Sequence, residues 1–100
     1  MDIRWIKEKI ANEDFILSLH GDKERQNDSL TISEIKEALL NGIIIEYYED
    51  TGRGESCLVA GFTDYGKPIH IVCGQMFEKV VIITVYIPSP PKFKSIYQRG

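Results

Sequence analysis

The sequence predicts an α+β fold, with N-terminal helices packed on one face of a four-stranded antiparallel meander sheet. Three observations support this class. Apolar residues recur at helical spacing in the first half of the chain, the period falls to two after Gly42, and turn-forming residues separate the alternating runs. Helices followed by strands favour a sheet covered on one side by helices. Because 100 residues fill one core and not two, residues 1–100 are expected to form a single domain.

Three helices are expected in the first half. Apolar spacing predicts a helix over residues 2–11. Residues 20–28 are polar, and residues 22–26 among them are good helix formers without an apolar stripe, so any helix there is short and has an exposed polar face. The third helix is the clearest, because Thr31 or Ser33 can cap it and Asn41-Gly42 can end it.

Four strands are expected in the second half. Alternating runs cover residues 43–49, 56–63, 68–74 and 79–87. A Gly-rich loop separates the first two runs, and a turn at residues 64–67 separates the second and third. The result is a meander in which each strand pairs with the next.

Strand parity divides this sheet into an apolar face and a mixed face. We expect Thr63 to pair with Pro68 across the turn, which places Cys57 opposite Gly74. The face beneath the helices then contains Leu58, Ala60, Phe62, Ile69, Ile71, Cys73, Val81, Ile83, Val85 and Ile87. The other face contains Glu46, Cys57, Val59, Thr63, His70, Val72, Ile82, Thr84 and Tyr86. Because this second set mixes polar and aliphatic side chains, it predicts a partly exposed working surface.

The charge is distributed unevenly along the chain. Residues 1–50 have six Lys or Arg against twelve Asp or Glu, whereas residues 51–100 have six against three, and the net charge is −3. Near the C-terminus, Lys92, Lys94 and Arg99 lie among aromatic residues. Such a mixture can contact a phosphate chain and stack on bases. The alternative is a solvated tail, which the small number of cations and the acidic molecule favour.

The chain begins with mixed charged and apolar residues, unlike a signal peptide or a transit sequence. Its apolar runs are far shorter than the ~20 residues that span a bilayer, so we expect a cytoplasmic protein without a membrane partner. Cys57 and Cys73 are expected to stay reduced. With His20 and His70 they make two Cys and two His, but no closely spaced pair exists to start a metal site.

Short motifs from Phe15 to Phe93 carry a family resemblance. They are Ser18-Leu-His20, Glu24-Arg25, Ile32-Ser-Glu-Ile35, Ala38, Asn41-Gly42, Glu46-Tyr47, Ser56-Cys-Leu58, Lys67-Pro-Ile-His70, Ile83-Thr-Val-Tyr86, Pro88 and Lys92-Phe93. As a set they resemble the domain-of-unknown-function family 4258, which belongs with the RelE/ParE-like toxin superfamily of small α+β proteins. Gly21 stands where that family usually has Ala, which predicts a looser helix around it.

This resemblance implies a toxin-type endoribonuclease that acts on mRNA, needs no metal or other cofactor, and is encoded beside a zinc-finger antitoxin. The catalytic candidates are His70, Arg53, Tyr86 and His20. The substrate-binding candidates are Arg25, Glu46, Thr84, Lys92 and Arg99. The reaction needs a base for the ribose 2′-hydroxyl, a cation for the phosphorane oxygens and an acid for the leaving oxygen. Either histidine suits the base, either Arg25 or Arg53 suits the cation, and Tyr86 or Thr84 can orient the phosphate or supply the proton.

Each candidate also has a purely structural interpretation. His70 can hydrogen-bond within the sheet, and His20 can cap a helix and bind Glu24. Arg53 lies between two glycines, where it is either a ligand clamp or a surface charge. Tyr86 is also a common type of sheet aromatic.

Three functions therefore stay open. The first is the endoribonuclease, which the acidic net charge disfavours because RNA affinity comes largely from neutralised phosphates. The second is a non-catalytic protein-binding module of the same fold with a co-encoded partner. The third is the binding of a small ligand or nucleotide in a groove beside Arg53 and His70.

Overall fold

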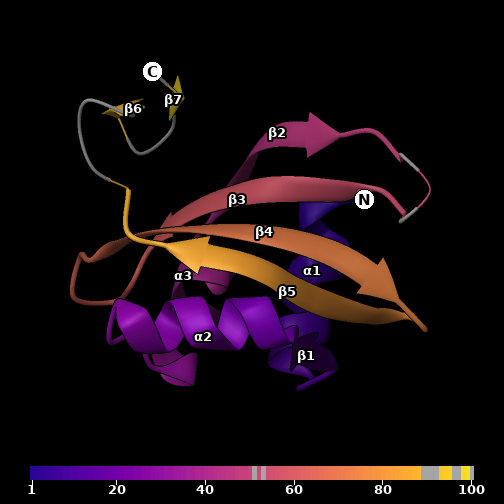
Figure 1. Cartoon of the computed structure of the whole chain (residues 1–100), viewed down its shortest axis with the longest axis horizontal. Helices are drawn as coiled ribbons and strands as arrows, with labels where there is room; N and C mark the ends of the chain where they lie inside the picture. Colours follow the sequence, from indigo (N-terminus) through magenta and orange to yellow (C-terminus); the bar gives the residue numbers. More distant parts are fainter. Residues whose placement is uncertain (51, 53, 89–92, 96–97, 100) are drawn as a thin grey trace.

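A computed structural model describes residues 1–50, 52, 54–88, 93–95 and 98–99 (Figure 1). The elements are α1 (Ile3–Ala11), β1 (Phe15–Leu17), α2 (Leu19–Asn27), α3 (Ile32–Leu40), β2 (Ile43–Tyr48), β3 (Ser56–Phe62), β4 (Pro68–Met76), β5 (Lys79–Tyr86), β6 (Phe93–Ser95) and β7 (Gln98–Arg99). The main sheet has five strands in the order β1-β5-β4-β3-β2, and β6 and β7 form a separate pair. The α+β class and the antiparallel meander of β2 to β5 are confirmed.

The expected four-stranded sheet is wrong by one strand, β1. This strand runs parallel to β5, with Phe15 opposite Val80 and Leu17 opposite Ile82. Three residues are too few to display a period of two, so periodicity could not reveal it. The sheet is therefore mixed.

The three helices begin with side-chain caps that the sequence supplies. Asp2 accepts a hydrogen bond from the backbone N–H of Arg4, and Ser18 accepts one from Gly21. At α3, Thr31 and Glu34 form a capping box, in which each side chain accepts from the other residue's backbone N–H. These caps satisfy donors that would otherwise be unpaired at the helix starts.

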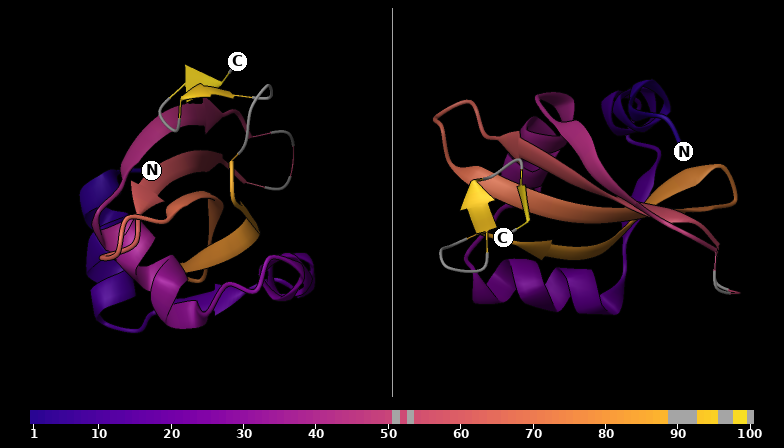
Figure 2. Two further views of the ribbon diagram at one scale, coloured as in Figure 1. Left: turned by 90° about the vertical axis from the view of Figure 1, so that its left-hand side faces the viewer. Right: turned by 90° about the horizontal axis from the view of Figure 1, so that it is seen from above.

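The core lies between the sheet and helices α1 and α3, which cover one face (Figure 2). Its fully buried side chains are Ile6, Ile10, Leu30, Ile35, Ala38, Leu39, Cys57, Val59, Ile69, Ile71, Cys73, Val80, Ile82 and Val85. Each buried Ile, Leu or Val contributes roughly 1.5–3 kcal/mol relative to an exposed position. This face is therefore sealed by packing.

The register of β3 differs by one residue from the prediction. Phe62 pairs with Pro68, and Cys57 lies opposite Cys73. The turn is one residue longer than expected, because the Thr63 N–H donates to the Lys67 carbonyl oxygen at 2.9 Å. The change reverses every side chain of β3. Cys57 and Val59 are core residues, while Leu58, Ala60 and Phe62 lie on the opposite face.

A β-bulge in β5 makes a second part of the predicted assignment of side chains to the two faces wrong. Val72 pairs with Thr84 and Cys73 pairs with Ile82, so Ile83 is an extra residue between them. Ile82 consequently faces the helices, whereas Val81 and Ile83, which were expected beneath the helices, lie on the opposite face. Beyond the bulge, Thr84 is placed as strand parity predicts.

Helix α2 lies along the outer edge of β5 where β1 ends. The Ser18 hydroxyl donates to the Ile83 carbonyl oxygen at 3.1 Å. The Val85 N–H donates to Glu24 at 3.1 Å, and the Ile87 N–H donates to Asp28 at 3.2 Å. These bonds occupy backbone groups that an edge strand would otherwise expose.

Gly21 allows this close approach. A Cβ atom at Gly21 would stand only 2.6 Å from the Ile82 carbonyl oxygen. The helix continues without interruption through this position. The expectation of a looser helix is therefore wrong, because Gly21 brings α2 tightly against β5.

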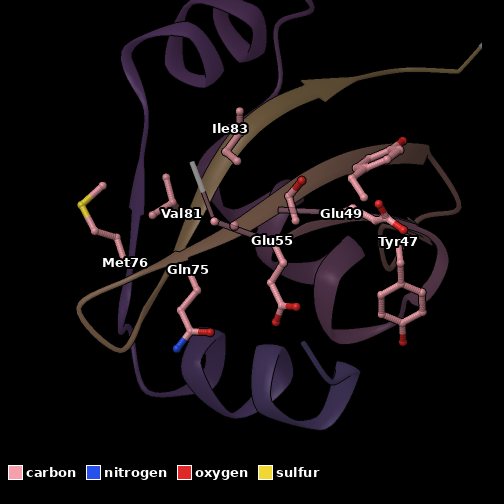
Figure 3. Close-up of a pocket in the computed structure, with 11 residues that line it drawn as sticks. Tyr47, Glu49, Glu55, Gln75, Met76, Val81 and Ile83 are labelled. Carbon is pink, nitrogen blue, oxygen red and sulfur yellow. The ribbon is translucent and has the colours of Figure 1, made fainter. Parts of the chain in front are cut away.

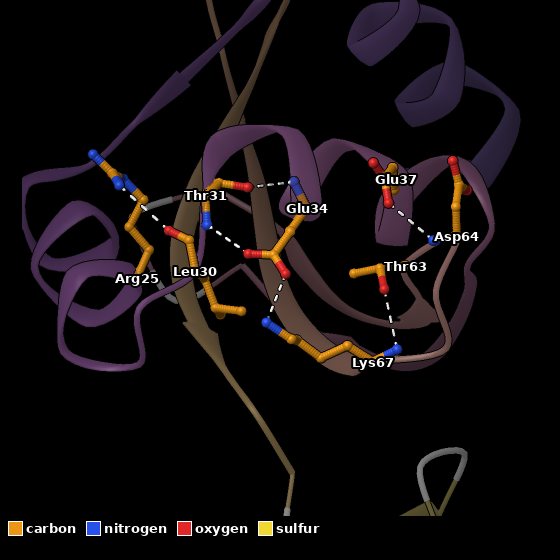
Figure 4. Close-up of polar contacts among 8 residues, drawn as sticks. All are labelled: Arg25, Leu30, Thr31, Glu34, Glu37, Thr63, Asp64 and Lys67. Carbon is orange, nitrogen blue, oxygen red and sulfur yellow. Dashed lines mark hydrogen bonds and ion pairs between the residues drawn. The ribbon is translucent and has the colours of Figure 1, made fainter.

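Polar contacts attach α3 to the turn between β3 and β4 (Figure 4). Lys67 donates to Glu34 at 2.6 Å, and the backbone N–H of Asp64 donates to Glu37 at 2.9 Å. The hydrogen bond from Lys67 lowers the pKa of Glu34 below its ordinary value of 4.5. These contacts hold the turn in the conformation that sets the register of β3.

Candidate functional site

The sheet face opposite α1 and α3 is called the outer face here. Aligned residues cross it in three rows set by the strand register. The rows are Tyr48, Ser56, Gly74 and Val81; then Glu46, Leu58, Val72 and Thr84; then Ala60, His70 and Tyr86. Figure 1 shows β6 and β7 toward the end of the sheet at which β5 finishes.

The outer face brings together four residues that the sequence grouped. His70 Nδ1 lies 3.3 Å from the Tyr86 hydroxyl oxygen, and the two rings meet edge to face. Thr84 and Glu46 belong to the next row. The placement agrees with strand parity, while the catalytic and substrate-binding roles of these residues stay predictions.

His70 is completely buried, whereas Glu46, Thr84 and Tyr86 are half-buried. The expectation of a partly exposed surface is therefore wrong for His70 and holds for the other three residues. In this arrangement His70 is a packed member of the sheet, as its structural interpretation predicts. A base must reach the proton that it removes, and His70 has no exposed atom with which to do so.

The candidates on α2 lie in local ion pairs. His20 is exposed, and its Nε2 lies 3.2 Å from Glu24. Arg25 donates to Asp22 at 2.7 Å and to the Leu30 carbonyl oxygen at 3.3 Å. Arg25 thus links α2 to the segment that precedes α3 (Figure 4).

Three candidates cannot be placed by their side chains. Arg53 and Lys92 lie outside the described residues, and only the backbone of Arg99 is described, in β7. The roles assigned to them stay predictions.

Asp50 binds the backbone of two described glycines, Gly52 and Gly54. Its carboxylate accepts hydrogen bonds from the backbone N–H groups of Gly52 at 2.8 Å and Gly54 at 2.9 Å. These bonds lower the pKa of Asp50. Gly52 and Gly54 have φ values of +101° and +89°, which other residues adopt with difficulty. The glycines are thus explained by the turn.

A pocket of about 590 Å³, which sequence patterns did not predict, lies at the other end of the outer face. Ser56 and Gly74 are small, so the sheet surface is low where they lie side by side between Tyr48 and Val81. Figure 3 shows Val81 and Ile83 on one side of this pocket and Tyr47 and Glu49 on the other. Ser56 and Gly74 lie side by side only in the observed register of β3 and β4. The register expected from the sequence separated them, so the pocket was not predicted.

The surroundings of the pocket are apolar and acidic. Tyr47 is 68% exposed, Met76 47%, and the next residue, Phe77, 89%. Glu49 and Glu55 line the pocket, and the Glu55 carboxylate accepts a hydrogen bond from the N-terminal ammonium group of Met1 at 2.9 Å. None of the described lining residues is Lys or Arg.

The two cysteines are core residues and not nucleophiles. Burial raises the pKa of Cys57 to about 11 and that of Cys73 well above its ordinary value. Neither thiol therefore forms a thiolate readily. Within the described part of the chain, no three His, Cys, Asp or Glu residues gather in a way that could hold a metal ion.

The fold and its outer face define a small α+β domain whose mixed sheet is covered by helices on one face. The chain belongs to the family described as Domain of unknown function (DUF4258), whose model matches residues 17–87. No curated protein and no solved structure matches it. The match runs from the end of β1 to the end of β5, so it includes both ends of the outer face. Among the described helices, none has the length and apolar character needed to cross a membrane.

Proposed function

We propose that this domain is a non-catalytic protein-binding module, whose partner docks at the pocket between Tyr48 and Ile83. The observation that carries the proposal is the pocket itself, with exposed Tyr47, Met76 and Phe77 on or beside its rim. Aromatic residues and Met are enriched at protein interfaces, and adjacent exposed apolar side chains mark interaction sites.

The electrostatics support a protein partner over RNA. An RNA site needs cations to neutralise phosphates. The pocket is lined by Glu49 and by Glu55, which pairs with the N-terminal ammonium group of Met1. Two of the described cations, Arg25 and Lys67, are engaged by carboxylates elsewhere. The best acid–base candidate, His70, is buried.

The first partner to test is a protein encoded in a neighbouring reading frame, with the zinc-finger antitoxin that the resemblance implies at the head of the list. Isothermal titration should give a micromolar or lower Kd with the wild-type chain. A Ser56→Leu variant, which fills the pocket floor, should weaken binding at least tenfold. A Tyr65→Ala variant should bind as wild type, because Tyr65 is fully exposed on the distant β3–β4 turn. Cleavage of labelled mRNA by the purified chain would contradict the proposal.

A metal-independent mRNA endoribonuclease of RelE-like fold is the second candidate. The observation that favours it is the His70–Tyr86 contact at 3.3 Å, beside Thr84 and Glu46 on one sheet face. The test compares the wild-type chain with an Arg53→Ala and His70→Ala double variant on labelled mRNA. Cleavage that the double variant loses would replace the first proposal with this one, provided that circular dichroism shows the variant is folded. If cleavage survives both changes, these two residues are not the site.

A further inference from the structure

The hairpin between β4 and β5 has an unfavourable turn sequence. Met76 pairs with Lys79, so Phe77 and Glu78 form a two-residue turn. Their φ values are +51° and +61°. Such a turn favours Asn-Gly, because side chains with a Cβ atom resist positive φ, and a bulky ring does so more than Asn.

The other described non-glycine residues with positive φ follow helix ends. Glu13 comes after α1 and Ser29 after α2. At the second site, the Leu30 N–H donates back to the Arg25 carbonyl oxygen at 2.7 Å, as in a common helix ending. Phe77 has no such explanation in the described backbone.

Phe77 is also the wrong residue for a solvated turn. Its side chain is 89% exposed, and it follows Met76, which lines the pocket. An exposed ring on a strained backbone is unfavourable in the isolated domain. A partner that buries the ring would account for both features, since strained residues cluster at binding sites and aromatic anchors dominate interfaces.

The charge around this hairpin selects the chemistry of the partner. The described residues of segments 46–55 and 74–79 include five carboxylates, Glu46, Glu49, Asp50, Glu55 and Glu78, and one side-chain cation, Lys79. The Glu55 carboxylate pairs with the N-terminal ammonium group of Met1 at 2.9 Å, and the negative charges still outnumber the positive ones. A second copy of the chain would bring the same carboxylates together, which is unfavourable, whereas a basic segment would be complementary.

We infer that Phe77 is the anchor of an interface for a basic partner segment, whose apolar side chains cover Phe77 and Met76 and whose cations reach the exposed Glu49 and Glu78. This inference rests on the proposed function and adds the position and charge of the partner. Phe77 supplies buried apolar area at the centre of the contact. The pocket beside it receives the neighbouring side chains of the same segment.

The test uses fluorescence anisotropy with a short labelled peptide that alternates leucine with arginine. Phe77→Asn suits the turn better and removes the ring, so it should raise the melting temperature while weakening peptide binding about 30-fold. Tyr65→Asn is the matched control, since it removes an equally exposed aromatic from another turn and should leave binding unchanged. A peptide with glutamate in place of arginine should not bind.

Different failures have different meanings. Equal peptide binding by the wild type and Phe77→Asn, or by the arginine and glutamate peptides, would overturn the inference, as would absence of binding to the wild type. Sedimentation that shows a dimer, dissociated by Phe77→Asn, would make the occupant a second copy and also overturn it. A neighbouring-frame protein that binds the wild type and Phe77→Asn equally would leave the proposed function standing without the inference. The proposed function itself fails on mRNA cleavage.

Discussion

The two ends of the outer face are built on the same three strands and differ in the volume of their side chains. At one end, His70 and Tyr86 lie side by side and His70 is fully buried. At the other end, Ser56 and Gly74 occupy the same strands and leave a pocket. The residues with the more reactive side chains are thus packed, while space exists where side chains are small. On this sheet, access for a partner is decided by side-chain volume more than by functional groups.

The largest expected effect is at the packed end. His70→Ala should lower the free energy of unfolding by about 2–4 kcal/mol, because it leaves a cavity in a buried position. Urea denaturation measures this change, with the half-buried Thr84→Ala as the milder control. Unchanged stability combined with lost mRNA cleavage would reverse the comparison and make this the working end.

At the pocket end, Phe77→Asn should stabilise the domain, whereas His70→Ala destabilises it. Relief of the left-handed backbone conformation should raise the free energy of unfolding by about 1 kcal/mol. Thermal denaturation beside Tyr65→Asn measures it. A loss of stability would mean that Phe77 contributes to the fold, and the contrast between a packed and a free end would weaken.

Gly74→Ala should lower the free energy of unfolding by less than about 1 kcal/mol, because its new Cβ would meet the movable Cδ1 atom of Ile83 at 2.8 Å. The same methyl group raises the pocket floor. We therefore expect weaker binding of the arginine peptide with little loss of stability. If both properties are unaffected, Gly74 does not shape the pocket in solution.

The smallest expected change in stability is at the turn between β3 and β4, which sets the register of the outer face. Glu34→Gln should cost about 0.5–1 kcal/mol at neutral pH, since the pair with Lys67 is partly exposed. The folded-state pKa of Glu34 is lowered, so its contribution is complete above the ordinary pKa of 4.5 and is lost as pH falls through the folded value. Wild type and variant should thus converge in acid. A difference that persists at low pH would mean that the charge of Glu34 is not what holds the turn.

Local patterns predicted the elements of this fold well. Helix α3 has a capping box and an apolar face, and the four meander strands alternate clearly. The two faces of the sheet were harder to predict, because one extra residue in a turn or strand reverses the side on which the following side chains lie. The longer turn at Thr63 reversed β3, and the bulge at Ile83 reversed part of β5.

The candidate site was predictable only as a group of side chains. Parity alone placed His70 beside Tyr86, since both lie on the correctly assigned segments. Burial of His70 depends on packing across the whole face, which no local pattern reports. The pocket depends on the alignment of Ser56 with Gly74, which a register shifted by one residue destroys.

The two margins of the main sheet are treated differently by the chain. On one side, β1 and then α2 occupy the backbone groups of β5. On the other side, β2 is the last described strand, with Ile43 50% exposed and Tyr47 68% exposed. A strand from another molecule could therefore pair with β5 beyond β1 only after displacing Ser18, Glu24 and Asp28 from its backbone groups.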